Sequence, residues 1–129
     1  MPKHILVVDD DPDIRQILQD RLDSYGYLTE TVADGWAAIR ALERNTPSGI
    51  FLDLRMPGMD GLEVLGHIRD LLPSIPVIIA TAAGTPEQVN VTIRAGAQAW
   101  LRKPFDTLQI KQVADRWFAN PHVLNESVA

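Results

Sequence analysis

The sequence predicts an α/β fold, a doubly wound five-stranded parallel sheet with five helices. Three observations predict it: short apolar segments alternate with segments of helical periodicity, helix-capping residues stand where the helices should begin, and 129 residues suffice for one core. Regular alternation of strand and helix favours parallel strands joined by right-handed crossovers, with helices on both faces of the sheet. We therefore expect residues 1–119 to form one domain and residues 120–129 a short C-terminal tail.

Five segments have the composition of strands, at residues 5–8, 27–32, 50–52, 77–80 and 99–101. The first, third and fourth are continuous apolar runs, as in strands that are buried on both faces. The second is rich in β-branched and aromatic residues, which favour strands. The fifth is a short apolar stretch that ends just before Lys103 and Pro104.

Five segments between and after these strands repeat apolar residues with helical spacing, at residues 14–22, 35–44, 62–72, 86–95 and 110–118. Each is preceded by a residue that favours the N-cap position: Asp11, Asp34, Asp60, Thr85 and Asp106. The last three are followed at capping-box spacing by Glu63, Gln88 and Gln109. The helix starts are therefore better marked than the helix bodies.

Composition excludes several functional classes. A formal net charge of −5 gives no basic footprint for nucleic acid or an anionic membrane. The absence of cysteine rules out disulfides, thiolate catalysis and thiolate metal sites. The longest apolar stretch, residues 75–83, is too short to span a membrane, and the N-terminus has no signal-peptide pattern. We expect a cytoplasmic protein without direct contact to nucleic acid or membrane.

Carboxylates gather at two of the predicted strand ends. Asp9, Asp10 and Asp11 follow the first strand, and Asp53 follows the third. In a flavodoxin-like strand order of 2-1-3-4-5 these strands are neighbours, so the carboxylates converge at the edge where such folds bind ligands. Two carboxylates 4 Å apart repel by about 4 kcal/mol at an effective dielectric near 20. Mg²⁺, which prefers oxygen ligands, is the simplest compensation.

Helix capping is the alternative explanation of the triple acid. It accounts for Asp11, because Pro12 suits the first helical position, and Asp13 would favour the helix dipole. It leaves Asp9 and Asp10 unexplained.

Two further strand ends add a hydroxyl and a cation to the same edge. Thr81 ends the fourth strand and Lys103 follows the fifth, and we expect Pro104 to fix the turn there, with a cis peptide bond as one hypothesis. Metal, ammonium and hydroxyl donors together suit phosphoryl transfer, which depends on positioning and charge stabilisation. The histidines show no ligand spacing, so we assign no metal or phosphodonor role to His4, His67 and His122.

Several motifs occur in the same order as in one known family: Ile-Leu-Val-Val-Asp-Asp-Asp-Pro at 5–12, Phe-Leu-Asp-Leu-Arg-Met-Pro-Gly-Met-Asp-Gly at 51–61, Ala-Thr-Ala at 80–82, Arg-Ala-Gly-Ala at 94–97 and Lys-Pro-Phe at 103–105. From about residue 3 to residue 118 the chain resembles the receiver domains of two-component response regulators, in particular those similar to chemotaxis regulators. Four of these five motifs stand at the expected strand ends, which makes this resemblance specific.

The resemblance implies roles for individual residues. Asp53 would be the phosphoacceptor, and Mg²⁺ would be held by the carboxylates of Asp9, Asp10 and Asp53 and by the backbone carbonyl of Arg55. Lys103 would pair with a phosphoryl oxygen. Thr81 would move to hydrogen-bond the phosphoryl group and, with the aromatic residue Trp100, would switch the output face.

The resemblance also implies partners and a mode of action. A histidine kinase or a histidine phosphotransfer protein would supply the phosphoryl group, and an output protein would be controlled. The domain would be a monomer or a phosphorylation-dependent homodimer. It would phosphorylate and dephosphorylate itself, so it would not be an enzyme with a separate substrate. It could equally be the receiver part of a longer transcriptional or enzymatic regulator.

Three departures from the family pattern stand out. Trp100 replaces the usual Tyr, Phe or His, and its larger ring opposes a full inward rotation. Ser48 and Gly49 replace an acid and an apolar residue, so we expect a looser entry to the third strand. The fifth helix lacks the charge pattern of receivers that dimerise in the winged-helix transcription-factor subfamily.

Three other functions are weighed against this one. A haloacid-dehalogenase-type phosphatase would use Asp9 and Asp11, but Asp13 and the lack of a later acidic pair do not fit. A flavodoxin-like cofactor binder needs a Ser/Thr/Gly-rich phosphate loop where this chain has three aspartates. A degenerate receiver, acting only as a binding module, would not need to keep every acid, hydroxyl and amine of the site.

Overall fold

The computed structural model describes residues 3–82 and 84–119, and it contains five strands and five helices that alternate along the chain. The strands are β1 (His4–Val8), β2 (Leu28–Val32), β3 (Gly49–Leu52), β4 (Val77–Thr81) and β5 (Ala99–Arg102). The helices are α1 (Pro12–Ser24), α2 (Gly35–Arg44), α3 (Gly61–Leu71), α4 (Pro86–Arg94) and α5 (Thr107–Trp117). The predicted tail and His122 lie outside the described residues.

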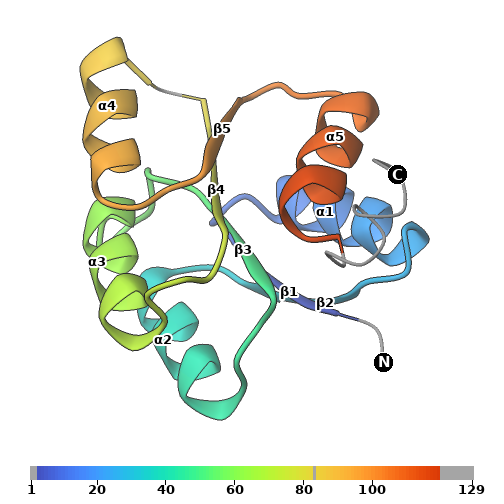
Figure 1. Cartoon of the computed structure of the whole chain (residues 1–129), viewed down its shortest axis with the longest axis horizontal. Helices are drawn as coiled ribbons and strands as arrows, with labels where there is room; N and C mark the ends of the chain where they lie inside the picture. Colours follow the sequence, from blue (N-terminus) through green and yellow to red (C-terminus); the bar gives the residue numbers. More distant parts are fainter. Residues whose placement is uncertain (1–2, 83, 120–129) are drawn as a thin grey trace, which may run out of the picture.

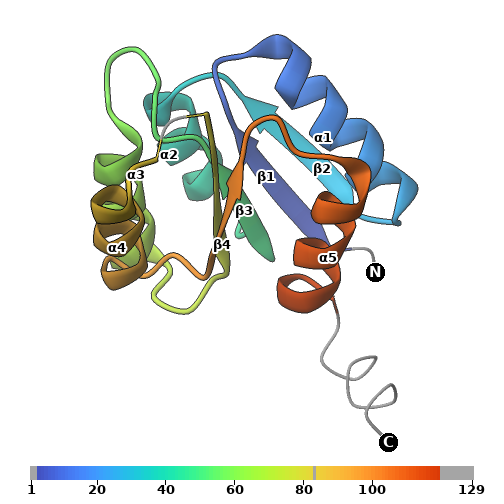
Figure 2. The same ribbon diagram turned by 90° about the horizontal axis from the view of Figure 1, so that it is seen from above.

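The strands form one parallel sheet in the order β2-β1-β3-β4-β5. Helices α1 and α5 cover one face, and α2, α3 and α4 cover the other (Figures 1 and 2). The predicted α/β class, strand order and helix number are therefore confirmed. Because all strands are parallel, their carboxyl ends lie at one edge of the sheet.

The core is divided by the sheet into two clusters, since successive strand residues point to opposite faces. In β1, Leu6 and Val8 pack with the helices α2 and α3, whereas Ile5 and Val7 pack with α1 and α5. Both sets are almost completely buried. This alternation explains why the sequence shows a continuous apolar run and not an apolar-polar pattern.

Every predicted N-cap is present: the side chains of Asp11, Asp34, Asp60, Thr85 and Asp106 each accept a hydrogen bond from a backbone N–H in the first turn. Complete capping boxes form at Thr85 and Asp106. At Asp60 the side-chain oxygen Oδ1 accepts from the N–H of Glu63 at 2.9 Å. The polar residues ahead of the helices therefore fix where each crossover turns back onto the sheet.

The start of β3 is paired from its first residue. The N–H of Ser48 donates to the carbonyl of His4 at 2.7 Å, and Gly49 pairs with Ile5. A Cβ at Gly49 would lie 2.2 Å from Cε1 of Phe118, so the missing side chain leaves room for that aromatic ring. The expected loosening of this strand is wrong, because Phe118 occupies the space.

Within the described part of the chain, none of the helices combines the length and the apolar character needed to cross a bilayer.

Candidate phosphoacceptor and metal site

The predicted functional side chains lie at the carboxyl edge of the sheet. Asp9 follows β1, Asp53 follows β3, Thr81 ends β4 and Lys103 follows β5. Backbone bonds continue the ladder into this edge: the N–H of Asp53 donates to Val8 at 2.9 Å, and that of Lys103 donates to Thr81 at 2.9 Å. The distances between these side chains are therefore determined mainly by the pairing of the strands and less by the loops.

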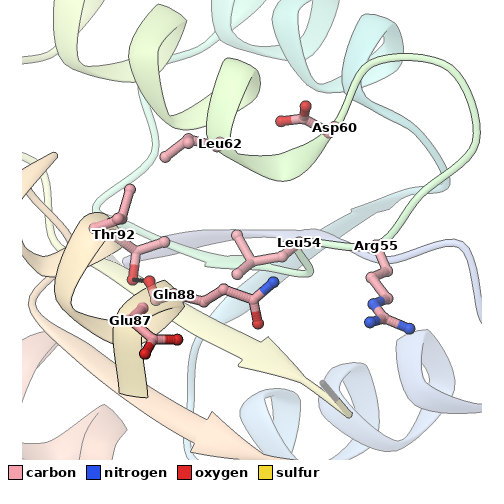
Figure 3. Close-up of a pocket in the computed structure, with 8 residues that line it drawn as sticks. Leu54, Arg55, Asp60, Leu62, Glu87, Gln88 and Thr92 are labelled. Atoms are coloured by element: carbon pink, nitrogen blue, oxygen red, sulfur yellow. Dashed lines mark hydrogen bonds between the residues drawn. The ribbon is translucent and has the colours of Figure 1, made fainter. Parts of the chain in front are cut away.

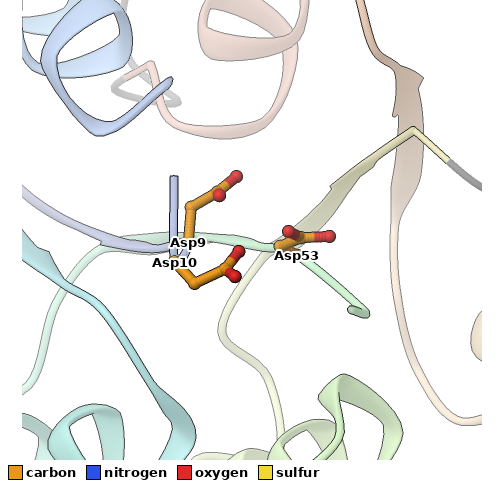
Figure 4. A group of neighbouring side chains, drawn as sticks. All are labelled: Asp9, Asp10 and Asp53. Atoms are coloured by element: carbon orange, nitrogen blue, oxygen red, sulfur yellow. The ribbon is translucent and has the colours of Figure 1, made fainter. Parts of the chain in front are cut away.

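The carboxylates of Asp9, Asp10 and Asp53 each offer an oxygen within 4.8 Å of the others. Figure 4 shows the three side chains as neighbours at the ends of β1 and β3. Asp9 and Asp53 are only 1% and 4% exposed, whereas Asp10 lies at the surface. The cluster is thus buried on two sides and open on the side of Asp10.

Lys103 brings a positive charge to the cluster. Its Nζ lies 2.7 Å from Oδ2 of Asp9 and 3.2 Å from Oδ2 of Asp53. Burial alone would lower the pKa of Lys103, but the two carboxylates outweigh that effect and raise it above its ordinary value. The ammonium is therefore retained at neutral pH, where it bridges the first and third strands.

Asp9 is the most constrained acid of the cluster. Its Oδ1 accepts from the N–H of Asp11 at 2.9 Å, and its Oδ2 forms an ion pair with Nζ of Lys103 at 2.7 Å. Burial raises the pKa of Asp9 in spite of Lys103, and Asp53 adds to the rise. A buried carboxylate in this state would gain from a further cation.

The donor set suits Mg²⁺. Three carboxylates and one ammonium leave two negative charges uncompensated, and carboxylate oxygens are the ligands that this ion prefers. The N–H of Arg55 donates to Oδ1 of Asp53 at 3.1 Å, which fixes the residue beside the cluster. Metal binding by the carbonyl of Arg55 stays a prediction.

Asp11 does not belong to the cluster, because its side chain caps α1 by accepting from the N–H of Asp13 at 2.9 Å. This separates the pair of acids that a haloacid-dehalogenase-type phosphatase would need. The capping interpretation of Asp11 is therefore correct, whereas Asp9 and Asp10 lie in the carboxylate cluster.

Of two further features of the site, the sequence suggested one and gave no indication of the other. The Lys103–Pro104 peptide bond is cis, as hypothesised. Arg15, which sequence analysis missed, donates from Nη1 to the carbonyl of Asp9 at 2.8 Å. Its only signal is its place one turn into α1, which is equally typical of a solvated arginine.

Thr81 and Trp100 lie on the neighbouring strands β4 and β5. Thr81 is 1% exposed. Trp100 is partly buried, packs on the core cluster beneath α2 and α3, and donates from Nε1 to Oγ1 of Thr92 in α4 at 2.6 Å. Thr92 could not be predicted as a partner of the indole, since nothing in the neighbouring sequence marks it as one.

Two hollows flank the acidic cluster. One, of about 430 Å³, lies between α3 and α4, with Leu54 and Leu62 across from Gln88 and Thr92 (Figure 3). The other, of about 540 Å³, adjoins Asp10 and is lined on its far side by Trp36 and Arg40. The second hollow therefore reaches the cluster directly, at Asp10.

The two histidines among the described residues, His4 and His67, lie away from this edge. Nε2 of His4 is 3.6 Å from Oε1 of Glu30, and His67 is exposed on α3. Neither belongs to the carboxylate cluster found among the described residues.

The comparison with known sequences identifies one family. The profile described as "Response regulator receiver domain" matches residues 5–115. The chain is 37% identical over 114 residues to the transcriptional regulatory protein GlrR of Escherichia coli (strain K12), a match that covers 88% of this chain and 26% of the relative. It is 33% identical over 117 residues to the sporulation initiation phosphotransferase F of Bacillus subtilis (strain 168), which covers 91% and 94%.

A solved structure agrees in fold. The receiver domain of the sensor histidine kinase PA1611 from Pseudomonas aeruginosa PAO1, solved with a magnesium ion coordinated in its active-site cleft, superposes with a TM-score of 0.83 at 30% identity. The match covers 93% of this chain and 100% of that one. This chain spans between a quarter and a half of the first curated relatives that it matches. The fold, the acidic cluster and these matches lead to one conclusion: the chain belongs to the response regulator receiver domain family.

Proposed function

We propose that this domain is a signalling switch that accepts a phosphoryl group on Asp53 in a Mg²⁺-dependent reaction. The observation that carries the proposal is the position of Asp53, whose carboxylate lies within one cluster with Asp9 and Asp10 and 3.2 Å from Nζ of Lys103. An acceptor needs a cationic neighbour for the incoming oxygens, and Lys103 supplies one at this edge of the sheet.

The proposed step is a displacement at phosphorus. A carboxylate oxygen of Asp53 forms a P–O bond with the phosphoryl group of a phosphohistidine, and the P–N bond breaks. The electron pair of that bond stays on the donor imidazole, which takes up a proton. Water later hydrolyses the acyl phosphate and returns Asp53 to its carboxylate.

Asp9, Asp10, Asp53 and the carbonyl of Arg55 are the proposed ligands of Mg²⁺, which when bound would neutralise the carboxylates and the transferred phosphoryl oxygens. Lys103 is close enough to Asp53 to bind a phosphoryl oxygen after transfer. Thr81, buried at the end of the adjacent strand, is the proposed hydroxyl donor that follows the phosphoryl group. Trp100 carries the change to the output face.

A histidine kinase or a phosphotransfer protein is the proposed donor, in the cytoplasm, and an output protein is the proposed reader. The domain acts on itself once per cycle and not on a turnover substrate. It works as a monomer or as a phosphorylation-dependent homodimer.

Intact-mass spectrometry of the purified domain after incubation with a small acyl phosphate and Mg²⁺ tests the phosphoacceptor. We expect the mass gain of one phosphoryl group in the wild type and none in Asp53→Asn. The matched control is Asp70→Asn, an exposed carboxylate on α3, which should be phosphorylated like the wild type.

Omitting Mg²⁺ should abolish the mass gain in all variants. Phosphorylation of Asp53→Asn at the wild-type level would place the acceptor elsewhere and refute the proposal. Steady turnover of an aryl phosphate that depends on Asp9 and not on Asp53 would favour the phosphatase alternative.

The second candidate is the receiver part of a longer transcriptional or enzymatic regulator. It is favoured by the 26% share of GlrR that the match covers. Affinity capture with the domain, with and without beryllofluoride, separates the two candidates. A separate partner retained only with beryllofluoride supports a stand-alone switch.

A further inference from the structure

Two side chains of β5 hold the connection between β4 and α4. Trp100 and Arg102 are alternate residues of the strand and so share one of its faces. The indole lies against Gly84, where an added Cβ would be 2.3 Å from Cζ3 of Trp100. Nη2 of Arg102 donates to the carbonyl of Gly84 at 2.8 Å. The backbone three residues after Thr81 is therefore held by β5 at two points.

The same indole is tied to α4. Its N–H, the only donor of the ring, donates to Oγ1 of Thr92 at 2.6 Å. Thr92 is 2% exposed, and its hydroxyl lies 2.9 Å from the carbonyl of Val89, to which it donates within its own helix. The hydroxyl thus accepts from the strand and donates to the helix, so its hydrogen-bonding capacity is used on both sides.

We propose that Trp100 is a fixed spacer between Gly84 and α4, and that Thr92 is the positioning residue that keeps it there. This inference rests on the proposed function, because the movement begins at Asp53 and Thr81. A displacement of Thr81 shifts Gly84, the indole transmits that shift to Thr92, and α4 moves as a unit. The ring itself does not rotate.

Rotation of the ring is opposed by two contacts at once. It would break the bond between Nε1 and Thr92, which would leave a buried hydroxyl oxygen without its donor. It would also remove the six-membered ring from the space above Gly84, the residue whose missing Cβ makes that contact possible. A phenyl ring in this position would have no such anchor.

Nuclear magnetic resonance of the full ¹⁵N-labelled chain, with and without beryllofluoride and Mg²⁺, tests the inference. The three indole N–H signals are assigned by single Trp→Phe variants of Trp36, Trp100 and Trp117. We expect the Trp100 indole N–H to exchange slowly with solvent in both states and to keep its contacts to Gly84. The backbone amides of α4 should shift when beryllofluoride binds.

Thr92→Val removes the hydroxyl at nearly constant shape. We expect fast exchange of the Trp100 indole N–H and a several-fold smaller response of the α4 amides, while the amides beside Asp53 respond as in the wild type. Thr92→Ser restores the hydroxyl and should restore both signals. Thr107→Val, an exposed threonine at the start of α5, is the matched control and should behave like the wild type.

The possible failures are distinguishable. If beryllofluoride shifts no amides beside Asp53 in the wild type, the proposed function fails. If those amides shift while the Trp100 ring loses Gly84 and its indole N–H becomes exposed, the ring rotates and the inference is wrong. A full α4 response in Thr92→Val also overturns it. Should Thr92→Val not fold, Trp100→Phe, which removes the same donor, must show the reduced α4 response.

Discussion

Asp10 is the carboxylate of the acidic cluster with the least compensation. Asp9 and Asp53 both contact Lys103, whereas among the described residues no hydrogen bond or ion pair is recorded for the side chain of Asp10. Its charge therefore raises the free energy of the folded state when no cation is present. The same charge is an advantage once a divalent ion binds.

Asp10→Asn should therefore stabilise the metal-free domain and weaken Mg²⁺ binding. Without Mg²⁺ we expect its free energy of unfolding to rise by up to about 1 kcal/mol, as for exposed charge pairs. Thermal melts in chelator and in Mg²⁺ measure both effects, with Asp70→Asn as control. An Asp10→Asn variant that melts below the wild type in chelator would contradict this explanation.

Tyr27 gives the domain a predictable response to alkaline pH. Its hydroxyl donates to the carbonyl of Ala114 at 3.4 Å, and its ring meets Phe118 edge-on with centroids 6.4 Å apart. Burial, with a contribution from the Asp115 charge, raises the pKa of the phenol above its ordinary value of 10.0. The neutral phenol is thus favoured in the folded state.

Proton linkage determines whether the free energy of unfolding rises or falls with pH. Below the unfolded-state pKa both states hold the proton, and as pH rises the unfolded chain releases it first, so stability is lost on the way through the folded-state pKa. We expect the free energy of unfolding to fall more steeply from about pH 9 to about pH 11 in the wild type than in Tyr27→Phe. Denaturant titrations at each pH measure this, and equal slopes would refute it.

The positions of the candidate site residues could be predicted from the sequence, because strand ends are local features. Asp9, Asp53 and Lys103 each follow a recognisable strand and Thr81 ends one, and parallel strands bring their ends to one edge whatever the side-chain packing. The contacts of Trp100 could not be obtained in this way. They depend on the direction of one indole and on two partners, Gly84 and Thr92, that show no periodic pattern.

At the scale of the elements, Arg69 joins the end of α3 to the end of α4. Its guanidinium donates to the carbonyls of Ile75 at 2.7 Å and Leu72 at 3.2 Å, to the carbonyl of Gly96, and to Oε1 of Gln98 at 3.0 Å. Burial lowers the pKa of Arg69. Two connections that lie far apart in the sequence are thereby held by one side chain.

The helix end that Arg69 contacts has its own geometry. Gly96 has a φ of +109°, and the N–H of Ala97 donates to the carbonyl of Thr92 at 3.0 Å, as in a Schellman motif. A Cβ at Gly96 would meet Nε of Arg69 at 2.4 Å. The glycine therefore serves both the turn and the close approach of the guanidinium.

Arg69→Met should destabilise the domain by about 2–4 kcal/mol, because several partly buried carbonyl groups lose their donor together. Urea denaturation gives the value. Arg94→Met, an exposed arginine in the last turn of α4, should change stability by less than about 0.5 kcal/mol. Equal effects of the two substitutions would show that the carbonyls find other donors.

Arg69 also marks a limit of prediction at this scale. The five helices and their N-caps were predictable, because periodicity and capping residues are local properties of the sequence of each segment. An arginine in the last turn of a helix, however, is typical of a solvated residue that complements the dipole. Its role as a link between loops depends on the packing of segments that are distant in sequence.

At the scale of the whole molecule, Phe118 connects the end of the last helix to the centre of the sheet. Its ring meets Phe51 edge-on at 5.4 Å and lies over Gly49, and it is 1% exposed. The fold class was predictable without this contact, because the alternation of strands and helices determines it. The match between an absent side chain in β3 and an aromatic ring after α5 was not.

Gly49→Ala should destabilise the domain by about 1–3 kcal/mol, as overpacking does in a filled core. The double variant Gly49→Ala with Phe118→Leu should recover part of that loss, because the smaller side chain leaves room for the methyl group. Thermal melts of the single and double variants measure the coupling. Gly66→Ala, at a helical glycine where an added Cβ meets nothing within 4 Å, is the control and should be neutral or stabilising.

The position of Phe118 has a practical consequence for protein engineering. A chimera that grafts a foreign effector onto this domain must keep the native chain through Phe118, because a junction upstream would remove the ring that covers Gly49. Chimeras whose fusion point lies before Phe118 should therefore express poorly, whereas chimeras whose fusion point lies after it should express and fold well. Phe118 is therefore the last residue that a transferable form of this domain must contain.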